Sequence, residues 1–135
     1  IGTISDYPGR ASAAYAAVAR QALDVADEVI FVGPQALRCS GARTHPRGAS
    51  LHAFLTAREA HQFLTDILVP GDLVLLKGSQ RVDHLLRLVL ARRGRIGCWR
   101  MACRRVTFCD ECALLRVPEL TWLRRPVSSL EPADA

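Results

Sequence analysis

The stretch Pro70-Gly71-Asp72-Leu73-Val74-Leu75-Leu76-Lys77-Gly78-Ser79 places a turn, an apolar run and a polar glycine-containing loop in direct succession. Proline fixes φ and glycine tolerates positive φ, so its first three residues predict a turn. The unbroken aliphatic run 73–76 predicts a strand that is buried on both faces, as in a parallel sheet. Lys77, the only lysine of the chain, then stands at the edge where open α/β sheets bind ligands.

Helices and strands alternate on either side of this stretch. Residues 56–68 predict a helix, because Thr56 and Glu59 form a capping box and the apolar residues recur at helical spacing. Residues 12–25, with Ser12 as the N-cap, and residues 82–91 also predict helices. Residues 29–33 and 51–54 read as strands, with a short helix and a loop between them. Residues 1–3 resemble the end of a strand, so we expect a fragment of a longer protein.

This alternation predicts a three-layer α/β fold, with a mostly parallel Rossmann-like sheet and helices on both faces. A chain of 135 residues, half of them hydrophobic, suits one such core. No apolar run approaches about 18 residues and the beginning of the sequence has no signal-peptide pattern, so we expect a cytoplasmic protein without a membrane partner. The net charge of +5 comes mostly from arginine, and we interpret it as a solvated surface.

Three segments carry a resemblance to a known family. They are residues 1–10 with the helix that follows, the segment Ala26-Asp27-Glu28-Val29-Ile30-Phe31-Val32-Gly33, and residues 70–79, which match a "P-G-D-x-V-L-x-K-G-S" pattern. In this order they resemble the C-terminal domain of the Mur ligases, which use ATP to add amino acids or dipeptides to the peptidoglycan precursor of the cell wall. The most similar members are those that add D-alanyl-D-alanine. The resemblance covers residues 1 to about 91.

The resemblance implies a domain that closes over ATP and the amino substrate, and that is inactive without the N-terminal and central ligase domains. ATP and Mg²⁺ are expected only with those domains, because this chain lacks a phosphate-binding G-xxxx-G-K-[ST] element. Carried over by position, the resemblance implies substrate-binding loops at Lys77, Gly78, Ser79 and Gln80 and at Gly33, Pro34 and Gln35, and a nucleotide-side loop with Asp6 and Arg10. In the alternative interpretation, Lys77 ends the strand in solvent and Ser79 caps the next helix.

Four cysteines form a second feature, which the resemblance does not explain. Cys98, Cys103, Cys109 and Cys112 are separated by four, five and two residues, a spacing that fits a structural zinc site with four thiolate ligands. Free buried or redox-active thiols and an iron–sulfur cluster are the alternatives. Cys39 reads as a lone thiol. We therefore divide the chain into a ligase-like domain (1–95), a cysteine-rich extension (96–127) that also covers a sheet edge, and a flexible tail (128–135).

Aromatic residues and arginines interleave with these cysteines: Trp99, Arg100, Arg104, Arg105 and Phe108. Zinc-stabilised, arginine-rich modules that bind nucleic acid or a protein partner have the same composition, so this is the rival function. Trp99 and Phe108 could equally pack around the metal. We favour the ligase domain, with a small amino acid or peptide as its ligand, and we expect His84 to be a helix-surface or structural residue.

Overall fold

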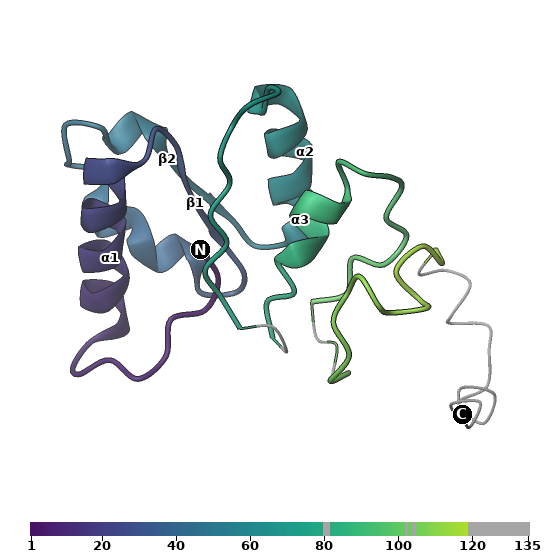
Figure 1. The fold of residues 1–135 in the computed structure, drawn as a ribbon. Helices are drawn as coiled ribbons and strands as arrows, with labels where there is room; N and C mark the ends of the chain where they lie inside the picture. The colour runs from purple at the N-terminus through teal and green to yellow at the C-terminus, as the bar shows by residue number, and fades with distance from the viewer. Residues whose placement is uncertain (80–81, 102, 104, 119–135) are drawn as a thin grey trace.

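The computed structural model describes residues 1–79, 82–101, 103 and 105–118. Its sheet contains two parallel strands, β1 (Val29–Val32) and β2 (Leu51–Phe54), in which Val29 pairs with Leu51. The described residues also form three α-helices and two 3₁₀ helices: α1 (Ala11–Val25), α2 (Ala57–Ile67), α3 (Leu86–Leu90), η1 (Ala36–Ala42) and η2 (Gly48–Ser50) (Figure 1). The mixed α/β class and the predicted strands at 29–33 and 51–54 are confirmed. No helix of the described residues is long and apolar enough to cross a membrane.

Residues 1–2 extend this sheet on the far side of β1. The Ile1 amine donates to the Ile30 carbonyl at 2.7 Å, and the Val32 N–H donates to the Ile1 carbonyl at 2.9 Å, which is the pattern of a parallel ladder. On the other side, the Gly2 N–H donates to the Lys77 carbonyl at 2.7 Å. The order across the sheet is therefore β2, β1, residues 1–2 and the end of the 70–77 segment.

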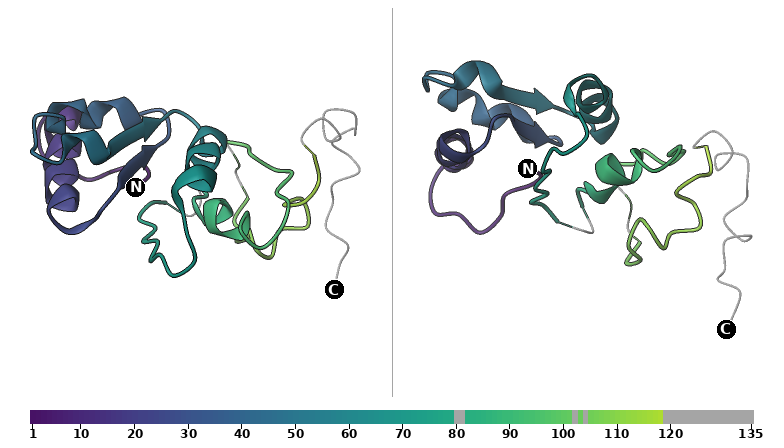
Figure 2. Two further views of the ribbon diagram at one scale, coloured as in Figure 1. Left: turned by 90° about the horizontal axis from the view of Figure 1, so that it is seen from above. Right: turned by 45° about the horizontal axis from the view of Figure 1, so that its top comes forward.

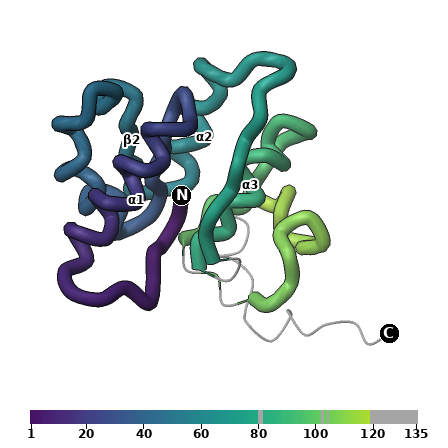
Figure 3. Tube along the Cα trace, turned by 60° about the vertical axis from the view of Figure 1, so that its left-hand side comes forward, coloured from purple at the N-terminus to yellow at the C-terminus, as the bar shows by residue number. Residues whose placement is uncertain are grey.

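The segment 73–76 is extended, but it is not the doubly buried strand that the sequence predicts. Leu73 is 97% exposed and Leu75 is 86% exposed, whereas Leu76 packs against the core. The segment runs from the end of α2 down to the N-terminus (Figure 3), where the neighbouring residues 1–2 contact only its last part. One side of the segment therefore lies against protein and the other against solvent, and the prediction of burial on both faces was wrong.

The residues of β1 alternate between two hydrophobic clusters. Phe31 packs with Tyr15, Leu23 and Cys39 from α1 and η1, and its ring centroid lies 5.7 Å from that of Tyr15. Val32 instead belongs to the cluster formed by α2, α3 and the cysteine-rich segment. Successive side chains of a strand point to opposite faces, so each cluster lies on its own face of the sheet. Figure 2 accordingly shows α1 and α2 on opposite sides of the strands.

The start of α2 is as the sequence predicts, whereas the starts of α1 and α3 are not. The Thr56 hydroxyl accepts from the Glu59 N–H, and the Glu59 carboxylate accepts from the Thr56 N–H, so the capping box is confirmed. In α1 the N-cap is Arg10, without a side-chain cap, and Ser12 lies inside the helix. The predicted helix 82–91 is shortened to α3, because His84 has a φ of 49°, which no α-helix accommodates.

Candidate functional site

The buried carboxylate of Asp83 forms hydrogen bonds that join the loop after Lys77 to the beginning of the chain. Asp83 is 4% exposed. Its carboxylate accepts from the Thr3 N–H at 2.9 Å, from the Thr3 hydroxyl at 2.6 Å and from the Ser79 N–H at 2.7 Å. These three donors satisfy the buried charge, and they hold Ser79 beside Thr3.

Two glycines pack directly against this carboxylate. A Cβ on Gly2 would lie 2.3 Å from Asp83 Oδ2, and a Cβ on Gly78 would lie 2.8 Å from the same atom. Both distances are shorter than a van der Waals contact, so both positions need glycine for close packing. Gly78 therefore has a structural reason to be glycine, whether or not a ligand approaches it.

The predicted substrate-binding residues gather at one edge of the sheet. Lys77 and Gly78 are exposed beside residues 1–3. Gly33, with a φ of 118°, ends β1, and its N–H donates to the Phe54 carbonyl at 2.9 Å. The Gly33 loop follows the carboxyl end of β1, whereas the Lys77 loop follows the 73–77 segment, which bonds to Gly2. Pro34 and Gln35 continue the second loop into solvent.

The remaining members of the predicted ligand loops differ in their surroundings. Asp6 and Arg10 are both exposed in the loop before α1, and Asp6 has a φ of 57°. Ser79 is half-buried and bonds to Asp83; it does not cap α3, whose N-cap is Leu85. Gln80 lies outside the described residues.

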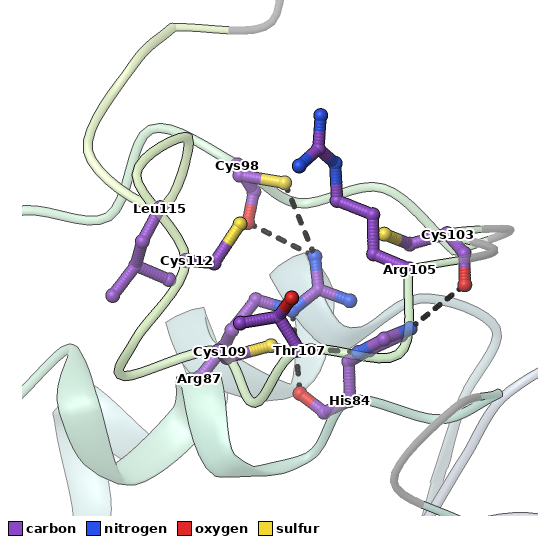
Figure 4. A pocket seen from close by; sticks show the side chains of 9 residues that line it. All are labelled: His84, Arg87, Cys98, Cys103, Arg105, Thr107, Cys109, Cys112 and Leu115. Atoms are coloured by element: carbon purple, nitrogen blue, oxygen red, sulfur yellow. Dashed lines mark hydrogen bonds between the residues drawn. The ribbon is translucent and has the colours of Figure 1, made fainter. Parts of the chain in front are cut away.

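The four cysteines of the extension line one cavity beside α3 (Figure 4). The cavity has a volume of about 20 Å³, enough for a single water-sized occupant. Its lining residues are His84, Arg87, Cys98, Cys103, Arg105, Thr107, Cys109, Cys112 and Leu115. None of the cysteines forms a disulfide. In the described part of the chain, no three His, Cys, Asp or Glu side chains are placed as a ready ligand set for a metal ion.

Arg87 brings a buried positive charge to this cavity. Its side chain is 1% exposed, and it donates to the carbonyl oxygens of Cys98 at 2.9 Å, Arg100 at 2.6 Å and His84 at 3.2 Å. It also reaches the Cys98 sulfur at 3.8 Å. Among the described residues no carboxylate pairs with it. The sequence analysis missed Arg87, although its place between Leu86 and Leu88 on an apolar helix is a signal of burial.

His84 also lines the cavity of the cysteines. It is a buried, structural residue, as one of the two predicted possibilities has it, and it does not lie on a helix surface. It is 2% exposed; its Nε2 lies 3.1 Å from the Cys103 carbonyl oxygen and its Nδ1 lies 3.4 Å from Cys109 Sγ. Burial raises the pKa of the Cys109 thiol, and the Arg87 guanidinium opposes that shift. The cavity therefore combines soft sulfur donors, an imidazole and a buried cation.

The aromatic residues of the extension are placed differently from one another. Trp99 is 9% exposed and stacks on His61, with ring centroids 4.9 Å apart. Phe108 is 53% exposed. Trp99 is thus a core residue of the cluster that contains α2, rather than an open platform for a nucleic-acid base. Arg104 lies outside the described residues.

Comparison of the chain with protein-family models, with curated proteins and with solved structures finds no match.

Proposed function

We propose that this chain is the substrate-side domain of an ATP-dependent, amide-forming ligase of the Mur type, which closes with further ligase domains over ATP and a small amino substrate. The observation that carries the proposal is the bonding of Asp83 to both Thr3 and Ser79. This bonding holds the loop of Lys77 beside residues 1–3, which lie between it and β1. The proposal places the protein in the cytoplasm, where its nucleotide is available.

The order of the extended stretches supports a Rossmann-like sheet as the finer description of the fold. In chain order residues 1–2 come first, β1 second, β2 third and the 73–77 segment fourth, and their order in space is third, second, first, fourth. This is the order of a doubly wound sheet, whose ligands bind at the carboxyl ends where the order reverses. The reversal lies between residues 1–2 and Lys77, and the Lys77 loop occupies that point.

Lys77 is suited to the binding of an anionic group at this edge. Its ammonium is an exposed point charge that can attract the carboxylate of an amino acid or peptide, or a phosphate. In such ligases ATP and Mg²⁺ convert the acceptor carboxylate into an acyl phosphate, and both are held by the other domains. The part of this chain is to bind and orient the amine that attacks. The peptidoglycan precursor is the acceptor that the resemblance to Mur ligases favours.

The test is a Lys77→Ala substitution in the complete natural protein. We expect amino-substrate-dependent release of phosphate from ATP to fall about tenfold or more, because one charged contact to the substrate is worth that much. Arg93→Ala is the matched control, since Arg93 is also an exposed cation but follows the C-terminal end of α3, away from the Lys77 loop. Its turnover should be unchanged. Equal turnover of both variants at saturating substrate would show that Lys77 is not part of the substrate site.

The ligase proposal itself needs a separate measurement. The natural protein should release phosphate from ATP only when an amino substrate and an acceptor are both present, with D-alanyl-D-alanine among the amino substrates tried. If no amino substrate in a panel of amino acids and dipeptides stimulates phosphate release, the amide-forming activity is excluded. The circular dichroism spectrum and melting temperature of each variant establish that the fold is intact.

A further inference from the structure

We infer that the cavity beside α3 binds one zinc ion through the thiolates of Cys98, Cys103, Cys109 and Cys112, with Arg87 as the buried counter-charge. The inference concerns a different part of the molecule from the Lys77 loop, and it does not depend on the proposed ligase function.

The lining of the cavity suits a soft metal ion. Four cysteines surround a cavity of about 20 Å³, and four thiolates are a ligand set that structural zinc uses. Zinc bonds to thiolates at about 2.3 Å in tetrahedral sites. The two halves of the donor set come from separate stretches, 98–103 and 109–112, so one ion would join them.

The cysteine side chains need to turn to form the complete set, because no three donors of the described residues are already placed for a metal. A cysteine has one side-chain torsion to its sulfur, and a change between staggered rotamers swings the sulfur without moving the backbone. All four thiols already line the same cavity. We therefore expect zinc binding to reorient the cysteine side chains around the ion.

The charge of Arg87 is the second, independent observation. Its guanidinium is buried and hydrogen-bonded to carbonyl oxygens, which satisfy its N–H groups but leave its charge uncompensated. Of the residues that line the cavity, only the cysteines can become anions. A zinc ion with four thiolates has a net charge of −2, which Arg87 and the neighbouring Arg105 balance. The nearest guanidinium contact to sulfur is already 3.8 Å, to Cys98.

The buried charge of Arg87 also disfavours the alternatives for these thiols. Two disulfides would remove every possible anion and leave Arg87 buried without a counter-charge, and so would four neutral thiols. Cys39 provides an internal comparison, because it is 2% exposed in the other hydrophobic cluster, between α1 and β1. Cys39 is the one cysteine among the residues of that cluster, so it has no further thiol beside it with which to bind a metal.

The experiment combines zinc analysis with spectroscopy on the whole chain. We expect about one zinc per chain by elemental analysis, retained in Cys39→Ser and lost in Cys109→Ser. Because Cys109→Ser could fail to fold, the wild-type chain is also loaded with Co²⁺, whose absorption bands should be those of four tetrahedral thiolates. Absence of zinc, two disulfides by mass spectrometry, loss of zinc from Cys39→Ser, or a Co²⁺ spectrum of mixed sulfur and nitrogen ligation would each overturn the inference.

The role of Arg87 has its own readout. Arg87→Met keeps the length and the apolar body of the side chain but removes the charge. We expect its zinc affinity, measured by competition with a chelator, to fall about tenfold or more, as for the loss of a charged contact. Arg58→Met, at an exposed position of α2, is the control and should bind zinc as the wild type does. Equal affinities of a folded Arg87→Met and the wild type would show that Arg87 is not the counter-charge.

Discussion

The Thr3 hydroxyl donates a hydrogen bond of 2.6 Å to the Asp83 carboxylate, although the two residues are 80 positions apart. The same carboxylate accepts from the backbone N–H groups of Thr3 and Ser79. Through these bonds the beginning of the chain and the loop after Lys77 are held together at one edge of the sheet.

The first prediction concerns Asp83 itself. Asp83→Ala leaves three partly buried donors without their acceptor, so we expect the free energy of unfolding to fall by about 2–4 kcal/mol in urea denaturation. Asp66→Ala removes an exposed carboxylate of α2 and should change it by less than about 0.5 kcal/mol. Similar losses for both variants would mean that the edge does not depend on Asp83.

A second prediction separates the two sides of the 73–76 segment. Leu76→Ala should lower the free energy of unfolding by about 1–3 kcal/mol, because Leu76 packs against the core that contains α2. Leu75→Ala should leave it within about 0.5 kcal/mol, since Leu75 is 86% exposed. Thermal and urea denaturation of both variants check this. Equal large losses would indicate that both faces are covered, as the apolar run alone predicts.

A third prediction tests the capping box of α2. Thr56→Ala removes the side-chain acceptor for the Glu59 N–H, so we expect a loss of about 1 kcal/mol in the free energy of unfolding. Thr65→Ala is the matched control: the Thr65 hydroxyl only donates to the His61 carbonyl inside the helix, and alanine has the higher helix propensity. A loss in Thr65→Ala as large as that in Thr56→Ala would contradict the assigned cap.

The fourth prediction is a pH dependence at His61. Burial, reinforced by nearby Arg92, lowers the pKa of His61 below its ordinary value of 6.5. Protonation then favours the unfolded chain, so the stability that neutral His61 provides is present above pH 6.5 and is lost as the pH falls through the lower, folded pKa. His61→Gln should lose less stability on acidification than the wild type. An NMR titration giving His61 a pKa of 6.5 or above would refute the assignment.

Local chemistry explains which parts of the fold the sequence predicts well. The capping box of α2 depends on residues three apart, and the apolar run of β1 is buried wherever a sheet forms around it. The segment 73–76 has an equally apolar pattern, but its burial depends on which other segments lie against it. The helix 82–91 has correct periodicity, yet tertiary hydrogen bonds of Asp83 and His84 hold its first turn outside the helix.

In the candidate sites, too, features that depend on residues close in sequence were predicted, and features that depend on tertiary contacts were not. The four cysteines, which are close in sequence, line one cavity, and the metal site that their spacing predicts stays a prediction. Arg87 could not be assigned to that cavity from composition, since arginine is rarely buried and its partners are carbonyl groups of residues 98 and 100. Asp83 was passed over because its partners, Thr3 and Ser79, carry no motif that points to it.

Asp83 and His84 are consecutive in the sequence, yet their side chains contact different parts of the structure. The left-handed φ of 49° at His84 directs its imidazole to the cysteines, while the carboxylate of Asp83 stays with Thr3 and Ser79. A backbone rotation at this one dipeptide would displace both side chains together. If the cavity binds zinc as inferred, zinc binding and the position of the Lys77 loop would be coupled, and each would change the equilibrium of the other by the same factor.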